Sequence, residues 1–219
     1  MHQRPSPNFG ARRDGLTPTI IVIHYTAMAC TEAAIQRLCD PSSEVSAHYV
    51  IGRDGTLVQL VAEADRAWHA GQGEWRGMTD INSRSIGIEL DNRGDHPFPE
   101  PQMMRLELLL REIRSRWPVA PEDVIGHSDM APGRKSDPGP RFDWARLARQ
   151  GLAAAAGKDP GPPDVSPELF RALARKSGFT AEVDDATLLA AVRLRFRPYA
   201  TGPLQRQDFA TLNHAAACR

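Results

Sequence analysis

The chain has 219 residues, of which 41% are hydrophobic and 25% are charged, a composition typical of a soluble globular protein and not of a disordered or membrane chain. Its 27 basic and 27 acidic side chains give a net charge of zero, which excludes a broad electrostatic attraction to nucleic acid or to an anionic membrane. We therefore expect a small or uncharged partner, no nucleic acid, and a monomer.

The N-terminal segment and the cysteines bear on the compartment. Residues 1–15 are polar and lack the apolar stretch of a secretory signal, and the run 20–23 is too short to span a bilayer. Cys30, Cys39 and Cys218 lack the spacing of a structural zinc or redox site, and we interpret them as free thiols. Unless a leader precedes this numbering, these features predict a cytoplasmic protein without an integral membrane segment. A periplasmic location is the alternative.

The first predicted elements are a strand, a helix and a hairpin. Residues 18–26 (PTIIVIHYT) form an apolar, β-branched run typical of a strand buried on both faces of a sheet. Residues 31–40 place their apolar side chains on one helical face. Two alternating runs, 46–51 and 56–61, flank the turn signal Arg53-Asp54-Gly55 and predict a β-hairpin.

A second strand and a long helix follow. Residues 84–90 alternate, which puts Ile86, Ile88 and Leu90 on one side and Gly87 and Glu89 on the other. Residues 100–117 carry apolar side chains at helical spacing, and Pro118 ends the helix. Strands that alternate with helices indicate an α/β domain.

The last third of the chain is predicted to form a loop, a linker and a small helical unit. Prolines and glycines in 126–140 predict a rigid polar loop without regular structure. Residues 151–167 are rich in Ala, Gly and Pro, and we interpret them as a linker. The domains are therefore predicted as 1–150 and 168–219, the second with two amphipathic helical patterns and a weaker one near the C-terminus.

His24, His127 and Asp137 are the candidate metal ligands. His24 ends the buried strand, His127 opens the Pro/Gly loop, and Asp137 lies ten residues further on. Two imidazoles and one carboxylate suit a catalytic zinc, because three protein ligands leave a fourth tetrahedral position for water. From spacing alone, a His and an Asp that only hydrogen-bond to backbone remain the alternative.

Lys135 and Glu89 are the candidate catalytic residues. Lys135 lies two residues before Asp137, so an extended segment points both side chains the same way, and an ammonium there can stabilise an oxyanion. A carboxylate held beside the metal, such as Glu89, can act as general base and then as general acid. A solvated lysine and a glutamate on the exposed face of an edge strand are the alternatives.

Five motifs occur in order between residues 15 and 147. They are VIHYT, VSAHYVIGRDG, RAWHAG, SIGIEL and GHSDMAPGRKSDPGP. Together they resemble the N-acetylmuramoyl-L-alanine amidase type 2 family, which also includes peptidoglycan recognition proteins. The resemblance implies a mixed central β-sheet flanked by helices, and a zinc ion at His24, His127 and Asp137. It also implies Glu89 as proton shuttle and Lys135 as the residue that stabilises the transition state.

The implied reaction is zinc-dependent hydrolysis of the amide between the lactyl group of N-acetylmuramic acid and L-alanine, in peptidoglycan or in anhydro-muropeptides. A non-catalytic peptidoglycan recognition protein on the same fold is one rival, although all five expected residues are present. A purely structural zinc is another, and it requires a fourth ligand from His48, His69 or a cysteine.

Four further residues are predicted to contact substrate. Trp68 and His69 lie in the motif RAWHAG and are expected to line the groove, with a structural histidine as the alternative for His69. Asn82 and Arg84 are expected to reach carboxylates or carbonyls of the stem peptide, against a default of surface arginine. Trp75 and Trp144 are candidates for an apolar wall or for the core, and His48 is expected to be structural.

The C-terminal unit has a looser resemblance of its own. The segments LFRALARKSGF, LLAAVRLRFRP and LQRQDFATLNHA are similar to the three-helix peptidoglycan-binding domain that follows the catalytic domain in some relatives. A helical cap that packs on the catalytic domain explains the same pattern.

Overall fold

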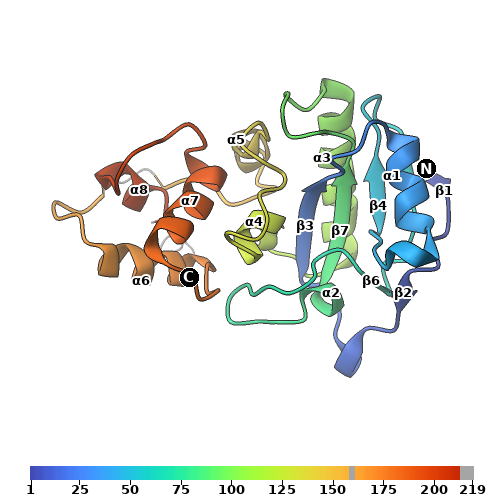
Figure 1. Cartoon of the computed structure of the whole chain (residues 1–219), viewed down its shortest axis with the longest axis horizontal. Coiled ribbons are helices and arrows are strands. Elements are labelled where there is room, and N and C mark those ends of the chain that lie inside the picture. The colour runs from blue at the N-terminus through green and yellow to red at the C-terminus, as the bar shows by residue number, and fades with distance from the viewer. Residues whose placement is uncertain (158–160, 213–219) are drawn as a thin grey trace.

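The protein, as a computed structural model, is described over residues 1–157 and 161–212, and a mixed sheet flanked by helices forms its larger part (Figure 1). The sheet order is β1-β5-β4-β7-β3-β8, and β2 pairs with β6 in a separate two-stranded sheet. The strands are β1 His2–Gln3, β2 Phe9–Gly10, β3 Ile20–Tyr25, β4 Tyr49–Ile51, β5 Leu57–Gln59, β6 Arg66–Ala67, β7 Ser85–Leu90 and β8 Val124–Gly126. The helices are α1 Thr31–Cys39, α2 Ile81–Arg84, α3 Glu100–Arg116, α4 His127–Met130, α5 Trp144–Arg149, α6 Pro167–Ser177, α7 Asp185–Phe196 and α8 Arg206–Ala210.

The centre of the sheet is parallel. Strand β3 pairs in parallel with β7 and β8, and β7 pairs in parallel with β4, whereas β4 and β5 form the antiparallel hairpin predicted from the sequence. In this register His24 lies beside Glu89, and Ile23 lies beside Gly126. The α/β class and the mixed sheet are therefore confirmed. The carboxyl ends of three neighbouring strands meet at one edge.

Strand β3 is buried on both faces, as its β-branched composition predicted. Residues Ile20–Ile23 are all fully buried, and successive side chains point to opposite sides of the sheet. Ile21 and Ile23 pack with apolar residues of β7 and α3, whereas Ile20 and Val22 face the opposite side. Helix α3 covers the first side and ends at Arg116, just before Pro118.

The C-terminal helices share a hydrophobic cluster with the second side of the sheet. Val22, Ile125 and Met130 pack in one cluster with buried residues of α6, α7 and α8. The rings of Trp75 and Phe179 meet edge to face, 5.2 Å apart. In Figure 1 the short helix α4 lies between the sheet and helices α6–α8. The division into 1–150, 151–167 and 168–219 stays a prediction, although Leu152 and Ala153 of the predicted linker are buried in the core of the larger unit.

A buried ion pair joins α7 to the segment that carries His127. Arg195 Nη1 donates to Asp129 Oδ2 at 2.9 Å, and Arg195 Nη2 donates to the Val124 carbonyl at 2.9 Å. The guanidinium lies 3.5 Å from the centre of the Trp144 ring. Asp129 Oδ2 also accepts the Gly126 N–H, at the start of α4. Through Arg195, the C-terminal unit thus stabilises the junction between β8 and α4.

Replacing Arg195 by alanine is expected to lower the free energy of unfolding by about 3 kcal/mol, because Asp129 would keep a buried charge without its partner. Denaturant unfolding of purified protein measures the change. Arg171→Ala is the matched control, since Arg171 of α6 and its partner Asp185 of α7 are both exposed. Little change is expected for the control. Equal stability of the Arg195 variant and the wild type would contradict this role.

One sequence prediction is wrong and several are incomplete. Residues 127–130 of the predicted irregular loop 126–140 form helix α4, whose start is capped by the Asp129 carboxylate. Strands β1, β2, β6 and β8 have only two or three residues each, too few for a periodic pattern. Cys30 and Cys39 are free thiols, as predicted, whereas Cys218 lies outside the described residues. Among the described helices, none is both long and apolar enough to cross a membrane.

Candidate active site

The carboxyl edge of the parallel strands carries most of the candidate site. His24 is the penultimate residue of β3, Glu89 is its neighbour on β7, and His127 follows β8 as the first residue of α4. Asp137 returns to the same point from the loop after α4. Because β3, β7 and β8 are adjacent, residues far apart in the sequence converge here.

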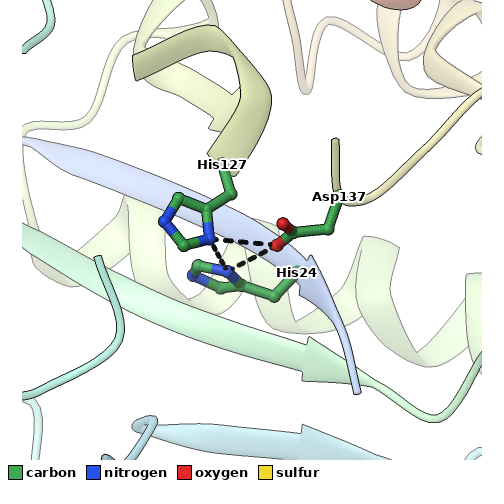
Figure 2. A group of neighbouring side chains, drawn as sticks. All are labelled: His24, His127 and Asp137. Carbon is green, nitrogen blue, oxygen red and sulfur yellow. Dashed lines mark hydrogen bonds and ion pairs between the residues drawn. The ribbon is translucent and has the colours of Figure 1, made fainter. Parts of the chain in front are cut away.

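The three predicted ligand atoms face one another (Figure 2). His24 Nδ1 lies 3.0 Å from His127 Nδ1 and 2.8 Å from Asp137 Oδ2. His127 Nδ1 lies 3.1 Å from the same Asp137 oxygen. Both imidazoles are buried, and the Asp137 side chain is 13% exposed. Within the described residues this is the group of histidine and acidic side chains placed to hold a metal ion.

The donor set fits a tetrahedral metal ion. Two nitrogens and one carboxylate oxygen at about 2.0–2.1 Å from a zinc ion would lie about 3.3 Å from one another, close to the spacing observed. His127 Nε2 lies 2.8 Å from the Ala70 carbonyl, so it carries the proton and leaves a lone pair on Nδ1. Lone pairs that converge at this distance call for a cation between them.

Burial and mutual contact shift the pKa values of these groups. Burial, assisted by His127, lowers the pKa of His24 to about 4, so the imidazole is neutral at pH 7 and free to bind a metal. Burial alone would raise the pKa of Asp137, but the close approach of the His127 and His24 imidazoles holds that pKa well below its usual range. The set therefore offers two imidazole nitrogens and one carboxylate oxygen as ligands.

Glu89 lies beside these ligands as a partly buried side chain that lines the cavity. Its Oε2 is buried and has no hydrogen-bond partner among the described residues. Burial, and secondarily the charge of Asp137, raises the pKa of Glu89 to about 8, while Lys135 opposes the shift. Strand β7 lies between β4 and β3, so the edge-strand alternative is wrong.

A cavity of about 430 Å³ opens over the site. Its lining includes Glu89, Lys135, the three candidate ligands, Trp68 and His69. Arg37 of α1 and Arg134 also line it, and neither was singled out from the sequence. Arg134 lies next to Lys135 in the same motif, which was a usable signal. Arg37 had none, because its place depends on how α1 packs.

The structure does not bring the other predicted substrate residues into this cavity. Asn82 is buried, and its Oδ1 accepts the backbone N–H groups of His69 and Ala70. Arg84 Nε donates to the Thr79 carbonyl, away from the cavity. Neither residue lines the cavity, and their contact with substrate stays a prediction. Trp75 and Trp144 are buried in the two cores, which excludes an exposed apolar wall.

His48 has the structural role expected for it. Its Nδ1 accepts the Gly87 N–H at 3.0 Å, and its Nε2 lies 3.1 Å from the Asp65 carbonyl. Burial lowers the pKa of His48 to about 3, so the ring stays neutral. Both nitrogens have partners on the protein backbone, and neither faces the ligand cluster.

The raised pKa of Glu89 predicts a pH-dependent stability in the metal-free protein. Between about 4.5 and 8 the folded chain keeps the Glu89 proton while the unfolded chain releases it, so the contribution of this residue falls as the pH rises. Glu89→Gln does not titrate. Relative to wild type, we expect the variant to gain roughly 3 kcal/mol of stability between pH 5 and pH 8.5, measured by denaturant unfolding in chelator.

Glu63→Gln provides a control of opposite sign. Burial opposes ionisation of Glu63, but hydrogen bonds from Arg116, Trp117 and Tyr49 lower its pKa, so this carboxylate stabilises the fold above its unfolded pKa. The Glu63 variant should lose stability relative to wild type at pH 8.5 and recover towards low pH. If the free energies of unfolding of wild type and Glu89→Gln change in parallel with pH, the pKa of Glu89 is not raised.

Comparison with known proteins places the chain in a family. Residues 14–140 match the family described as N-acetylmuramoyl-L-alanine amidase. The N-acetylmuramoyl-L-alanine amidase AmiD of Escherichia coli (strain K12) is 36% identical over 210 residues, covering 82% of this chain and 75% of AmiD. The 1,6-anhydro-N-acetylmuramyl-L-alanine amidase AmpD of the same organism is 37% identical over 160 residues, covering 65% of this chain and 87% of AmpD.

Two solved structures resemble the whole fold. The complex of AmiD from E. coli with anhydro-N-acetylmuramic acid-L-Ala-D-gamma-Glu-L-Lys has a TM-score of 0.81 at 31% identity, and the match covers 93% of this chain and 90% of that chain. AmpDh3 from Pseudomonas aeruginosa, in complex with anhydromuramic pentapeptide, has a TM-score of 0.80 at 31% identity, with 96% and 94% covered. As its motifs predicted, the chain belongs to the N-acetylmuramoyl-L-alanine amidase family that residues 14–140 match.

Proposed function

We propose that the protein is a zinc-dependent N-acetylmuramoyl-L-alanine amidase that hydrolyses the amide between the lactyl group of muramic acid and the L-alanine of a peptidoglycan stem peptide. One observation carries the proposal. The ligand atoms of His24, His127 and Asp137 converge in a cavity that also contains Glu89 and Lys135. The solved complexes of AmiD and AmpDh3 with anhydromuropeptides support this class of substrate.

We assign the metal as zinc, held by His24 Nδ1, His127 Nδ1 and Asp137 Oδ2. Two nitrogens and one oxygen are a donor set typical of catalytic zinc. When bound, zinc supplies Lewis acidity, which polarises a carbonyl and makes water acidic enough to attack near neutral pH. Within the described residues the cluster holds three ligands and no fourth, which favours a catalytic over a structural ion.

Glu89 is the proposed proton carrier. Its carboxylate can take a proton from the attacking water and return it to the alanine nitrogen, which must be protonated to leave as an amine. Burial places the pKa of Glu89 near 8, within reach of both duties at neutral pH. Its buried Oε2, without a protein partner among the described residues, is available for that proton.

Lys135 is the proposed oxyanion stabiliser. It is exposed at the rim of the cavity, and its charge is felt by both Glu89 and His24. A cation so placed favours the negative charge that develops on the amide oxygen during attack. Trp68 and His69, which line the same cavity, are proposed to contact the sugar or the first residues of the peptide.

For helices α6–α8 we propose peptidoglycan binding, as the looser sequence resemblance implies. The match to AmiD covers 82% of this chain and so includes at least part of this region, whereas the match to AmpD covers 65%. The helices also act as a cap, because they pack on the sheet. We further propose a monomer in the cytoplasm, where thiols such as those of Cys30 and Cys39 stay reduced, with the periplasm as the alternative.

The deciding experiment compares two substrates, a purified anhydro-muramyl tetrapeptide and intact sacculi, each with chelator and with zinc added back. Release of free peptide that chelator stops and zinc restores is the expected result. A strong preference for the small substrate supports recycling in the cytoplasm, and efficient cutting of sacculi supports wall remodelling in the periplasm. If zinc binds and neither substrate is cut, the protein is a recognition module and the roles of Glu89 and Lys135 are withdrawn.

A further inference from the structure

A chain of hydrogen bonds links His24 through His69 and Ser85 to helix α2. His24 Nε2 lies 3.0 Å from His69 Nδ1, and His69 Nε2 lies 3.2 Å from Ser85 Oγ. Ser85 Oγ lies 2.6 Å from the carbonyl oxygen of Ile81. We propose that His69, anchored by Ser85, is a positioning residue that holds His24 in the tautomer and orientation needed to bind the metal. The inference rests on the proposed function, because it concerns the same metal site.

The carbonyl at the end of the chain sets the direction of every bond in it. A carbonyl oxygen only accepts, so the Ser85 hydroxyl donates to Ile81 and can only accept from His69. His69 Nε2 therefore carries the proton and its Nδ1 is bare. The bare His69 Nδ1 accepts from His24 Nε2, which leaves His24 Nδ1 with a lone pair. That lone pair points at Asp137 and His127, where the metal is proposed.

The fold holds the His69 ring in this place. Asn82 Oδ1 accepts the N–H groups of His69 and Ala70 at 3.0 and 2.8 Å, which fixes the backbone. Gly87 leaves room for the ring, since a Cβ there would lie 2.4 Å from His69 Cγ. The rings of His24 and His69 meet edge to face at 5.1 Å. Asn82 and Gly87 thus support the position of the His69 ring.

The two candidate imidazole ligands are oriented by different means. His127 donates directly to the Ala70 carbonyl, whereas His24 depends on a side chain that has a proton on only one of its nitrogens. A side-chain substitution can therefore remove the partner that orients His24, whereas the backbone partner of His127 would remain. Loss of such an outer partner typically weakens metal binding by about 10- to 100-fold.

Zinc affinity of four purified variants tests the inference, measured by competition with a chromogenic chelator at pH 7. His69→Leu removes the acceptor and should weaken zinc binding by about 10- to 100-fold. His69→Asn, whose carboxamide oxygen can take the place of Nδ1, should restore most of the affinity. Ser85→Ala removes fewer atoms and is less disruptive to folding. It should reduce zinc affinity by less than His69→Leu does. His48→Leu removes a neighbouring buried imidazole that is not part of the His24–His69–Ser85 hydrogen bonds. It should lower the melting temperature and leave zinc affinity near wild type.

A second readout reports the tautomer directly. Long-range proton–nitrogen NMR spectra of the metal-free protein should show His24 protonated on Nε2 in wild type and His69→Asn, and a mixture of tautomers in His69→Leu. Equal zinc affinity in wild type, His69→Leu and Ser85→Ala, with an unchanged His24 tautomer, overturns the positioning role. Wild type that binds no zinc overturns the proposed function instead, so the two failures are distinct.

Discussion

Glu89→Gln is expected to lower kcat for amide hydrolysis by about 10³-fold, because the glutamine cannot move a proton between the attacking water and the leaving nitrogen. The variant should still bind zinc, since its ligands lie on β3, α4 and the following loop and not on β7. Single-turnover hydrolysis of an anhydro-muramyl peptide, with metal content measured on the same sample, gives both numbers.

The control for this change is the Glu63→Gln variant. Glu63 is a partly buried glutamate bonded to Arg116 and Trp117, outside the cavity lining. Its replacement should leave kcat near wild type. Zinc-loaded Glu89→Gln that hydrolyses substrate at the wild-type rate would remove the proton transfer from the proposed mechanism, whatever else the pocket does.

Removal of the metal is expected to have the largest effect of all. Chelator treatment should bring hydrolysis below detection, a loss beyond about 10⁴-fold, because the Lewis acid that activates water and carbonyl is gone. Added zinc should restore the wild type. His127→Ala should not recover at the same zinc concentration, because two of the three proposed ligands cannot hold the ion in place.

His96→Ala is the matched control for the ligand variant. His96 is partly exposed in the loop after β7, and its Nδ1 lies within hydrogen-bond distance of Asn92 Nδ2. It does not belong to the candidate metal-binding group. It should respond to chelator and zinc as wild type does. Activity in His127→Ala that equals wild type after metal addition would show that the ion lies elsewhere or is not needed.

The central architecture followed from the sequence because it depends on local patterns. The apolar run that became β3, the alternating run that became β7 and the helical spacing that became α3 each signal one element and its buried side. The ligand cluster followed less directly. Spacing suggested His24, His127 and Asp137, but only the family motifs favoured them over a pair of ordinary hydrogen-bonded loop residues.

The environment of the site was beyond the sequence because it depends on contacts between distant elements. Asn82 and Arg84 were expected at the substrate, yet the backbone of helix α2 turns one into the core and the other toward Thr79. The bond between His69 and His24 joins residues 45 positions apart, through the parallel pairing around β7. The contribution of Arg37 depends on the packing of α1, which composition does not reveal.

The hydrophobic cluster between the sheet and α6–α8 has a practical consequence for dissection of the protein. A chain cut after residue 150 would present Val22, Ile125 and Met130, together with their apolar neighbours, to water. It would also leave Asp129 charged and without Arg195 behind the His127 helix. Such a fragment is expected to aggregate on expression and to lose metal, so an inactive fragment would say nothing about wall binding. Substitutions of solvent-exposed residues of α6–α8 in the intact chain are needed to separate peptidoglycan binding from catalysis.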